Sequence, residues 1–168
     1  MNATAPHDRA RPSAEGTAPG RLDVLGGVAD YSGSLVLQMP IALTTTVRIT
    51  VREEPGLSFA SGIEPPVTLP WPSDEVLEPA VRSESVRGWL DSHGVPRWGR
   101  YPLGCLVLFS EAWRWRPAGG LAFSIRSAVP ASMGVSSSAA LEVATLRGLE
   151  QLANRHKRIT TVRWPCIM

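Results

Sequence analysis

A run of small and hydroxyl-bearing side chains at residues 130–140 has the composition best suited to chemistry. Pro130 and Gly134 punctuate this turn, and three consecutive serines are then followed by two alanines. The apolar spacing that follows predicts a helix from Ser137 to about Asn154. The first amides of such a helix lack intrahelical partners and carry about half a positive charge, so they attract phosphate. A serine hydroxyl there can also bind Mg²⁺ that shares its ligands with phosphate.

Two sharper catalytic motifs do not fit this turn. A Walker phosphate loop requires Gly-Lys-Ser/Thr, and the only lysine of the sequence is Lys157. A hydrolase elbow, Gly-x-Ser-x-Gly, would require glycine where Ser138 stands. The histidines that could assist a serine nucleophile, His7, His93 and His156, all lie in polar or turn-like segments. The turn is therefore either a phosphate cradle or an ordinary helix cap with close packing.

Composition limits the class of protein. The chain has 168 residues, of which 43% are hydrophobic and 19% charged, which is enough for one domain with a core. A net charge of +2 without a dense basic stripe argues against nucleic acid as a partner. No apolar run has the length of a membrane span. Cys105 and Cys166 lack metal-site spacing, which suits a reducing, cytoplasmic location.

Periodicity and turn residues predict one domain that contains both strands and helices. Residues 1–18 read as a disordered leader. Predicted strands cover residues 22–25, 34–39, 47–51, 57–60 and 121–127, and predicted helices cover residues 74–92, 102–115 and 137–154. Residues 62–72 are Pro-rich and read as a surface connection. This order predicts an α+β fold, a mixed β-sheet with helices packed on one face. The six tryptophans are expected to lie in the core or to cover its edge. As an alternative, Trp71 or Trp89 could contact an adenine.

The segment from Pro19 to Pro40 carries a family resemblance. It reads Pro-Gly-Arg-Leu-Asp-Val-Leu-Gly-Gly-Val-Ala-Asp-Tyr-Ser-Gly-Ser-Leu-Val-Leu-Gln-Met-Pro. It resembles the N-terminal motif of the galactokinase, homoserine kinase, mevalonate kinase and phosphomevalonate kinase (GHMP) superfamily. The turn at residues 130–140 resembles that family's second, phosphate-binding motif, and the two motifs occur in the family's order. Within the family, residues 26–40 are most similar to the galactokinase branch and to L-arabinokinases. The resemblance covers residues 19–155, the N-terminal, ATP-binding domain.

The resemblance implies ATP-dependent phosphorylation of the anomeric hydroxyl of a monosaccharide, L-arabinose or galactose, with Mg²⁺ as the metal. Arg21 is implied to stabilise the charge of the transferred phosphoryl group. Asp30 is implied to accept hydrogen bonds from the sugar, with Gly27 and Tyr31 as further sugar-binding residues. Ser138 is the implied Mg²⁺ ligand. The implied ATP-binding residues are Pro130, Met133, Gly134, Val135, Ser136, Ser137, Ser138 and Ala139. Without the resemblance, the sequence would predict that Arg21 forms a surface ion pair and that Asp30 caps a turn.

One departure from the family pattern concerns the sugar. Galactokinases have Glu-His where this sequence has Gly27 and Val28, and those two side chains hold the exocyclic hydroxymethyl group of galactose. L-arabinose has the galactose ring configuration without that group. Loss of the polar pair removes partners for a hydroxyl that the pentose does not have, and so avoids unpaired polar groups. The sequence therefore favours a pentose.

A second departure concerns turnover. The family's catalytic aspartate lies in a glycine-rich, Asp-Gln-containing segment after the phosphate turn, and a third glycine-rich motif lies in a C-terminal domain. This sequence has neither, and residues 156–168 read as an atypical tail produced by truncation or a frameshift. Little or no kinase turnover is expected of this polypeptide. The alternatives are a non-catalytic nucleotide- or sugar-binding module and a remnant without function. The oligomeric state is left open.

Overall fold

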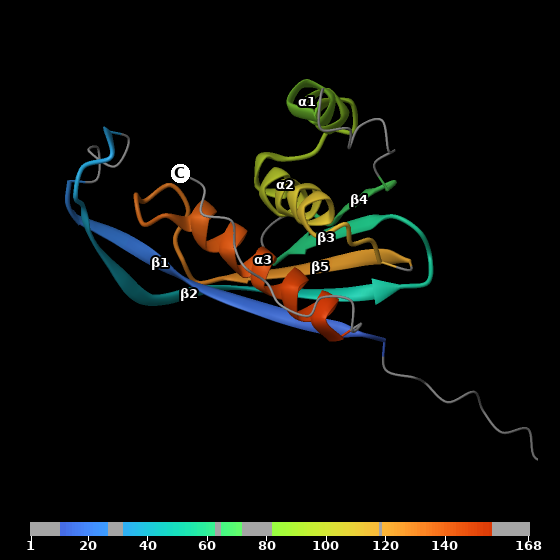
Figure 1. The fold of residues 1–168 in the computed structure, drawn as a ribbon, viewed down its shortest axis with the longest axis horizontal. Coiled ribbons are helices and arrows are strands. Elements are labelled where there is room, and N and C mark those ends of the chain that lie inside the picture. The colour runs from blue at the N-terminus through green and yellow to red at the C-terminus, as the bar shows by residue number, and fades with distance from the viewer. Residues whose placement is uncertain (1–10, 27–31, 63–64, 72–81, 118, 156–168) are drawn as a thin grey trace, which may run out of the picture.

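The computed structural model describes residues 11–26, 32–62, 65–71, 82–117 and 119–155. In this described part, four strands come first along the chain, followed by two helices, a fifth strand and a third helix (Figure 1). No helix in this described part is long and apolar enough to cross a membrane. The strands are β1 (Ser13–Leu25), β2 (Leu37–Arg52), β3 (Leu57–Ser61), β4 (Val67–Leu69) and β5 (Gly120–Ser127), and the helices are α1 (Arg82–Ser92), α2 (Arg97–Ala112) and α3 (Ser137–Arg155).

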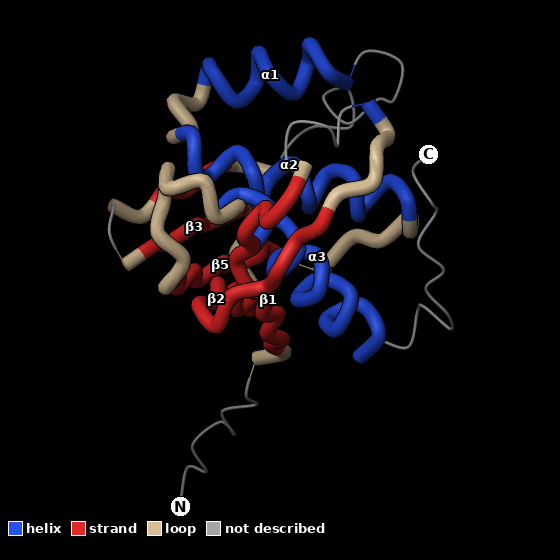
Figure 2. The backbone as a smooth tube through the Cα atoms, turned by 90° about the vertical axis from the view of Figure 1, so that its left-hand side faces the viewer, coloured by secondary structure: helices blue, strands red, loops and turns tan. Residues whose placement is uncertain are grey.

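The strands form one mixed sheet in the order β1-β2-β5-β3-β4. Only the pairing of β3 with β5 is parallel, and the other neighbours are antiparallel. Helix α3 packs against β1 and β2, and α2 packs against α3. Helix α1 lies outermost, beyond α2 from the sheet (Figures 1 and 2). The predicted α+β class, with helices on one face of a mixed sheet, is confirmed.

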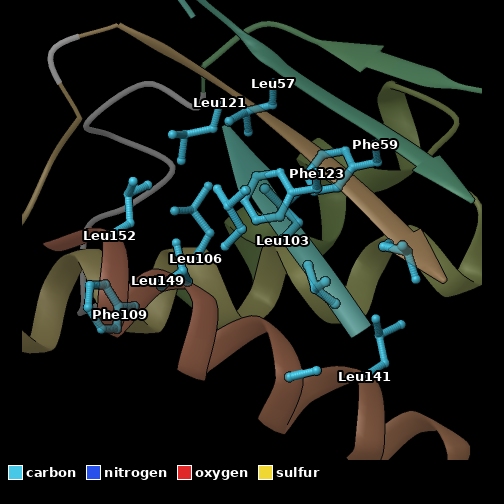
Figure 3. Close-up of a cluster of buried hydrophobic side chains, with 14 of the residues drawn as sticks. Leu57, Phe59, Leu103, Leu106, Phe109, Leu121, Phe123, Leu141, Leu149 and Leu152 are labelled. Atoms are coloured by element: carbon cyan, nitrogen blue, oxygen red, sulfur yellow. The ribbon is translucent and has the colours of Figure 1, made fainter. Parts of the chain in front are cut away.

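The core lies between the sheet and the two inner helices (Figure 3). Leu121, Phe123 and Ile125 alternate along β5 and are buried, as their spacing predicts. The rings of Phe59 and Phe123 stack with centroids 4.8 Å apart. Helix α2 contributes Leu103, Leu106 and Phe109, and α3 contributes Leu149 and Leu152. Trp71 and Trp89 are partly buried against this core, which matches their prediction as cover residues.

Two apolar residues on the inner helices are exposed rather than buried in the core. Leu108 on α2 is 56% exposed and Val143 on α3 is 43% exposed. Most of the other large exposed apolar side chains lie on the segments of β1 and β2 that extend past the start of α3, and on the residues next to them (Figure 1). They are Leu22, Val24, Leu25, Leu35, Leu37, Met39 and Leu43. Concentrated apolar surface of this kind is typical of regions that pack against other protein.

The prediction of a disordered leader up to residue 18 is wrong for residues 13–18. Strand β1 begins at Ser13 and pairs with β2 from Thr50 onward. Its buried positions alternate, but they are occupied by Ala14, Gly16, Ala18 and Gly20. These side chains are too small to produce the apolar alternation that identifies a strand in a sequence. Residues 1–10 are outside the described part of the chain.

Three further element boundaries differ from the sequence prediction. Strand β2 continues through Pro40, because its pairing with β5 begins only at Thr45 and the missing N–H is not needed there. Helix α2 begins at Arg97 and contains Pro102, whereas Pro102 was expected at the helix start. Strand β4 lies within the segment expected to be a connection. Residues 72–81 and the tail at 156–168 are not among the described residues.

Candidate phosphate-binding site

The turn between β5 and α3 has an unusual backbone. Ser132 and Ser136 have φ angles of 60° and 57°, and Gly134 has a φ of 71°. The left-handed region costs a non-glycine residue about 1–2 kcal/mol, and such strain is concentrated at functional sites. The Ala140 amide donates to the Ser136 carbonyl at 3.0 Å, so helical bonding begins where the sequence predicts. A Cβ added to Gly134 would meet no atom within 4 Å, which leaves this side of the turn open.

The turn is joined to β1 at the arginine of the first motif. The Arg21 amide donates a hydrogen bond to the Val135 carbonyl at 3.0 Å. The preceding residue, Gly20, is buried, and a Cβ there would lie 2.8 Å from Val129 Cγ1 and 3.0 Å from the Val135 carbonyl oxygen. Only a residue without a side chain permits this approach. The two motifs, far apart in the sequence, are therefore in direct contact in the fold.

A cavity of about 360 Å³ lies between β1, β2 and the first turns of α3. It brings together three of the predicted site residues, Arg21, Ser136 and Ala139. Gln38 also lines the cavity and was not among the predicted site residues; it is a polar residue that interrupts an apolar run from Leu35 to Met39. The complete lining consists of Ala18, Pro19, Gly20, Arg21, Gln38, Pro40, Ser136, Ala139, Ala140 and Val143.

The Arg21 side chain is held at this cavity with one donor unsatisfied. Its Nε atom is buried and makes no hydrogen bond within the described residues. The nearest carboxylate oxygen, Asp23 Oδ1, is 3.6 Å from Nε, too far for a hydrogen bond. A buried donor without a partner costs about 1–3 kcal/mol. Arg21 and Asp23 therefore form a long, partly exposed ion pair, and the guanidinium keeps one donor that the described residues do not satisfy.

The remaining predicted residues of the turn lie at its outer side or at the helix start. Pro130 and Met133 are exposed and do not line the cavity. Val135 is half-buried and uses its carbonyl to hold Arg21. Ser137 and Ser138 are in the first turn of α3, with Ser138 exposed. Free amides and hydroxyls at this helix terminus suit phosphate oxygens.

The structure offers no carboxylate cage for a metal in its described part, where no group of three or more His, Cys, Asp or Glu side chains comes together. Mg²⁺ does not require one, since it usually takes one or two protein ligands plus phosphate oxygens and water. Ser138 therefore stays a predicted ligand. Glu142, one turn further along α3, is half-buried, and burial raises the pKa of its carboxyl above the ordinary 4.5.

Cys105, on the neighbouring α2, is not a candidate nucleophile. Its thiol is buried and lies 3.7 Å from the Glu142 carbonyl. Burial, reinforced by the nearby Glu142 charge, raises the pKa of the thiol to about 12. The thiolate, which is the reactive form, is therefore scarce at neutral pH. The three predicted sugar-binding residues, Gly27, Asp30 and Tyr31, belong to a segment outside the described residues.

Comparisons with known proteins point to one family of enzymes. Residues 100–162 match the family model for the GHMP kinases N terminal domain. The chain is 31% identical over 160 residues to an L-arabinokinase from Arabidopsis thaliana, covering 79% of this chain and 15% of that protein. It is 34% identical over 146 residues to the galactokinase of Homo sapiens, covering 85% of this chain and 33% of that protein. The solved mevalonate kinase of Methanococcus jannaschii has the same fold, with a TM-score of 0.66 at 17% identity over 92% of this chain and 43% of its own.

The fold and these matches are those of a GHMP kinase N-terminal domain. The chain belongs to the GHMP kinase family, and the relatives that it matches at more than 30% identity are sugar kinases. It spans about a third of the length of the galactokinase and 15% of the L-arabinokinase.

Proposed function

We propose that the chain forms the nucleotide-binding part of an ATP-dependent sugar-1-kinase that acts in the cytoplasm on the anomeric hydroxyl of a monosaccharide. The observation that carries the proposal is the 3.0 Å bond from the Arg21 amide to Val135 in the phosphate turn. Together with the cavity that Arg21 and Ser136 both line, it supports a cation beside the helix terminus, where a triphosphate would end. The similarity to an L-arabinokinase and a galactokinase supports a sugar as the acceptor.

The residues of the site fit ATP and Mg²⁺. The open side of Gly134 and the first amides of α3 would hold the phosphates. The guanidinium of Arg21, whose side chain is 41% exposed, would donate to the terminal phosphate and stabilise charge there. The Ser138 hydroxyl would hold Mg²⁺ together with phosphate oxygens. When bound, ATP supplies the phosphoryl group and Mg²⁺ neutralises part of its charge.

Nucleotide binding tests this proposal directly. Calorimetry on the 168-residue chain is expected to give an affinity for ATP with Mg²⁺ about tenfold or more above that for AMP, because only ATP reaches Arg21. Equal affinities for ATP and AMP would contradict the proposed site.

Two glycine substitutions distinguish a specific effect on ATP binding from a general loss of stability caused by backbone strain. Gly134 and Gly94 both have left-handed φ angles, 71° and 60°, and neither has an atom within 4 Å of an added Cβ. Alanine at either position should therefore cost a similar amount of stability, about 1–2 kcal/mol. Gly134→Ala is expected to weaken ATP binding as well, because the methyl group occupies the open side of the turn. Gly94→Ala, between α1 and α2, should leave ATP binding unchanged.

For the sugar, we propose L-arabinose over galactose, held by Asp30 with Gly27 and Tyr31. The support is the Gly27-Val28 pair in place of Glu-His, since a site without those groups leaves no polar partner unpaired when the hydroxymethyl group is missing. In a full-length relative that shares this Gly-Val pair, phosphorylation assays should show L-arabinose turned over faster than galactose. Substitution of both residues by Glu and His should shift the preference toward galactose. Galactose preference that the double substitution leaves unchanged would contradict the pentose assignment.

A further inference from the structure

Two side chains next to Arg21 form a pair across the β1–β2 ladder. Asp23 and Gln38 are register partners on the two strands. The Gln38 Nε2 atom donates a hydrogen bond of 2.9 Å to Asp23 Oδ1. The same oxygen is the one that lies 3.6 Å from Arg21 Nε. One carboxylate oxygen is therefore anchored from the opposite strand and faces the guanidinium.

The local backbone explains why these three side chains meet. Arg21 and Asp23 are two residues apart on β1, so their side chains leave the same face of the strand. The β1–β2 register shifts between Pro19 and Arg21, and again between Asp23 and Leu25. Irregularities of this kind re-aim side chains near binding sites. Gln38 also lines the cavity beside Arg21, so one member of the pair stands at its wall.

We propose that Asp23, anchored by Gln38, is a positioning residue that holds the Arg21 guanidinium at the cavity in the orientation that receives a terminal phosphate. The proposal rests on the proposed function of the cavity. A long arginine side chain loses much rotational freedom when it is fixed. An anchored carboxylate beside Nε confines that side chain before the ligand arrives, so less freedom is lost on binding. Because the 3.6 Å separation is longer than a hydrogen bond, the carboxylate can orient the guanidinium without occupying one of its donors.

Asp23 also has a competing effect, which would lower the affinity for ATP. Its negative charge repels phosphate, so removing the carboxylate would strengthen ATP binding if charge alone mattered. Asp23→Asn removes the charge but keeps an oxygen that can accept from Gln38 and face Arg21. Asp23→Ala removes both the charge and the anchor. The two substitutions therefore distinguish positioning from repulsion.

The first readout is nucleotide affinity measured by calorimetry. Asp23→Ala is expected to weaken ATP binding about fivefold, while AMP changes less than about twofold. Asp23→Asn should bind ATP at least as well as the unsubstituted protein, which amounts to rescue by the conservative variant. Gln38→Leu should weaken ATP in the same direction as Asp23→Ala, by about threefold. Tighter ATP binding by Asp23→Ala would overturn the proposal.

The second readout needs no nucleotide. The Arg21 Nε–H resonance in an ¹⁵N NMR spectrum can be identified by its loss in Arg21→Lys. Its exchange with water should be slow in the unsubstituted protein and in Asp23→Asn, and faster in Asp23→Ala. Unchanged exchange in Asp23→Ala would overturn the positioning role. If ATP shows no advantage over AMP, the proposed function fails, but the Nε–H exchange still decides whether Asp23 positions Arg21.

Discussion

Arg21→Met is expected to reduce the affinity for ATP by about 10- to 100-fold and to leave the affinity for AMP unchanged. Hydrogen bonds between charged partners contribute about 1.5–3 kcal/mol, and each 1.4 kcal/mol is about a tenfold change in affinity. Methionine keeps the unbranched shape of the side chain but has no donor for phosphate. Because the Arg21 side chain is 41% exposed and makes only the long Asp23 contact, the fold should remain intact. Calorimetry with ATP and AMP, alongside thermal unfolding, measures both effects.

Two matched variants complete that experiment. Arg126 lies on β5 and pairs with Glu15 at 3.7 Å, with its side chain 73% exposed. Arg126→Met removes the same charge from the protein outside the cavity and should leave ATP binding unchanged. Arg21→Lys keeps the charge but loses the planar arrangement of donors. Its ATP affinity should therefore fall between those of Arg21→Met and Arg126→Met. An equal loss of ATP affinity in Arg21→Met and Arg126→Met would show that net charge, and not the position of Arg21, governs binding.

The part of the site that sequence could predict is the part encoded by local backbone chemistry. Pro130, Gly134 and the serines identify a turn at a helix start, and α3 begins at Ser137 as predicted. The alternating residues of β5 likewise identify its buried face. These features depend on neighbours within a few residues, which is what periodicity and capping rules describe.

The remainder of the site depends on long-range packing. Gln38 reaches the cavity only because β2 pairs with β1 in the register that opposes Asp23 to Gln38. A one-residue change of register would place every side chain of the strand on the other face, and no local pattern specifies that register. The contact between Arg21 and Val135 is equally non-local. From sequence it could be expected only through the family resemblance.

The first half of β1 was missed for a related reason. The side of this strand that faces α3 must be nearly flat, so alanine and glycine occupy the positions where a typical strand has valine or isoleucine. Composition alone therefore made residues 13–18 look disordered. Because β1 lies so close to α3, a side chain added on this face of the strand would disturb their packing.

Gly16→Ala is expected to destabilise the fold by about 3 kcal/mol or more, at the upper end of the cost of overpacking. A Cβ at Gly16 would overlap the Ala144 carbonyl oxygen and the Gly148 amide nitrogen, which are backbone atoms of α3. A helix backbone cannot rotate away as a side-chain tip can, so β1 and α3 must separate. The hydrogen bond from Arg147 Nη1 to the Thr17 carbonyl would be disturbed with them. Denaturant unfolding should show a lower midpoint.

Gly88→Ala is the matched control, because Gly88 lies in α1 with no atom within 4 Å of an added Cβ. Alanine there should stabilise the helix by about 0.5–1 kcal/mol. The same chemical change is thus expected to have opposite signs at the two positions. Because β1 also carries Arg21, separation of β1 from α3 would move the guanidinium away from the phosphate turn. Gly16→Ala should therefore lose ATP affinity even under conditions where it stays folded, and full affinity in that variant would show that the β1–α3 contact does not set the site.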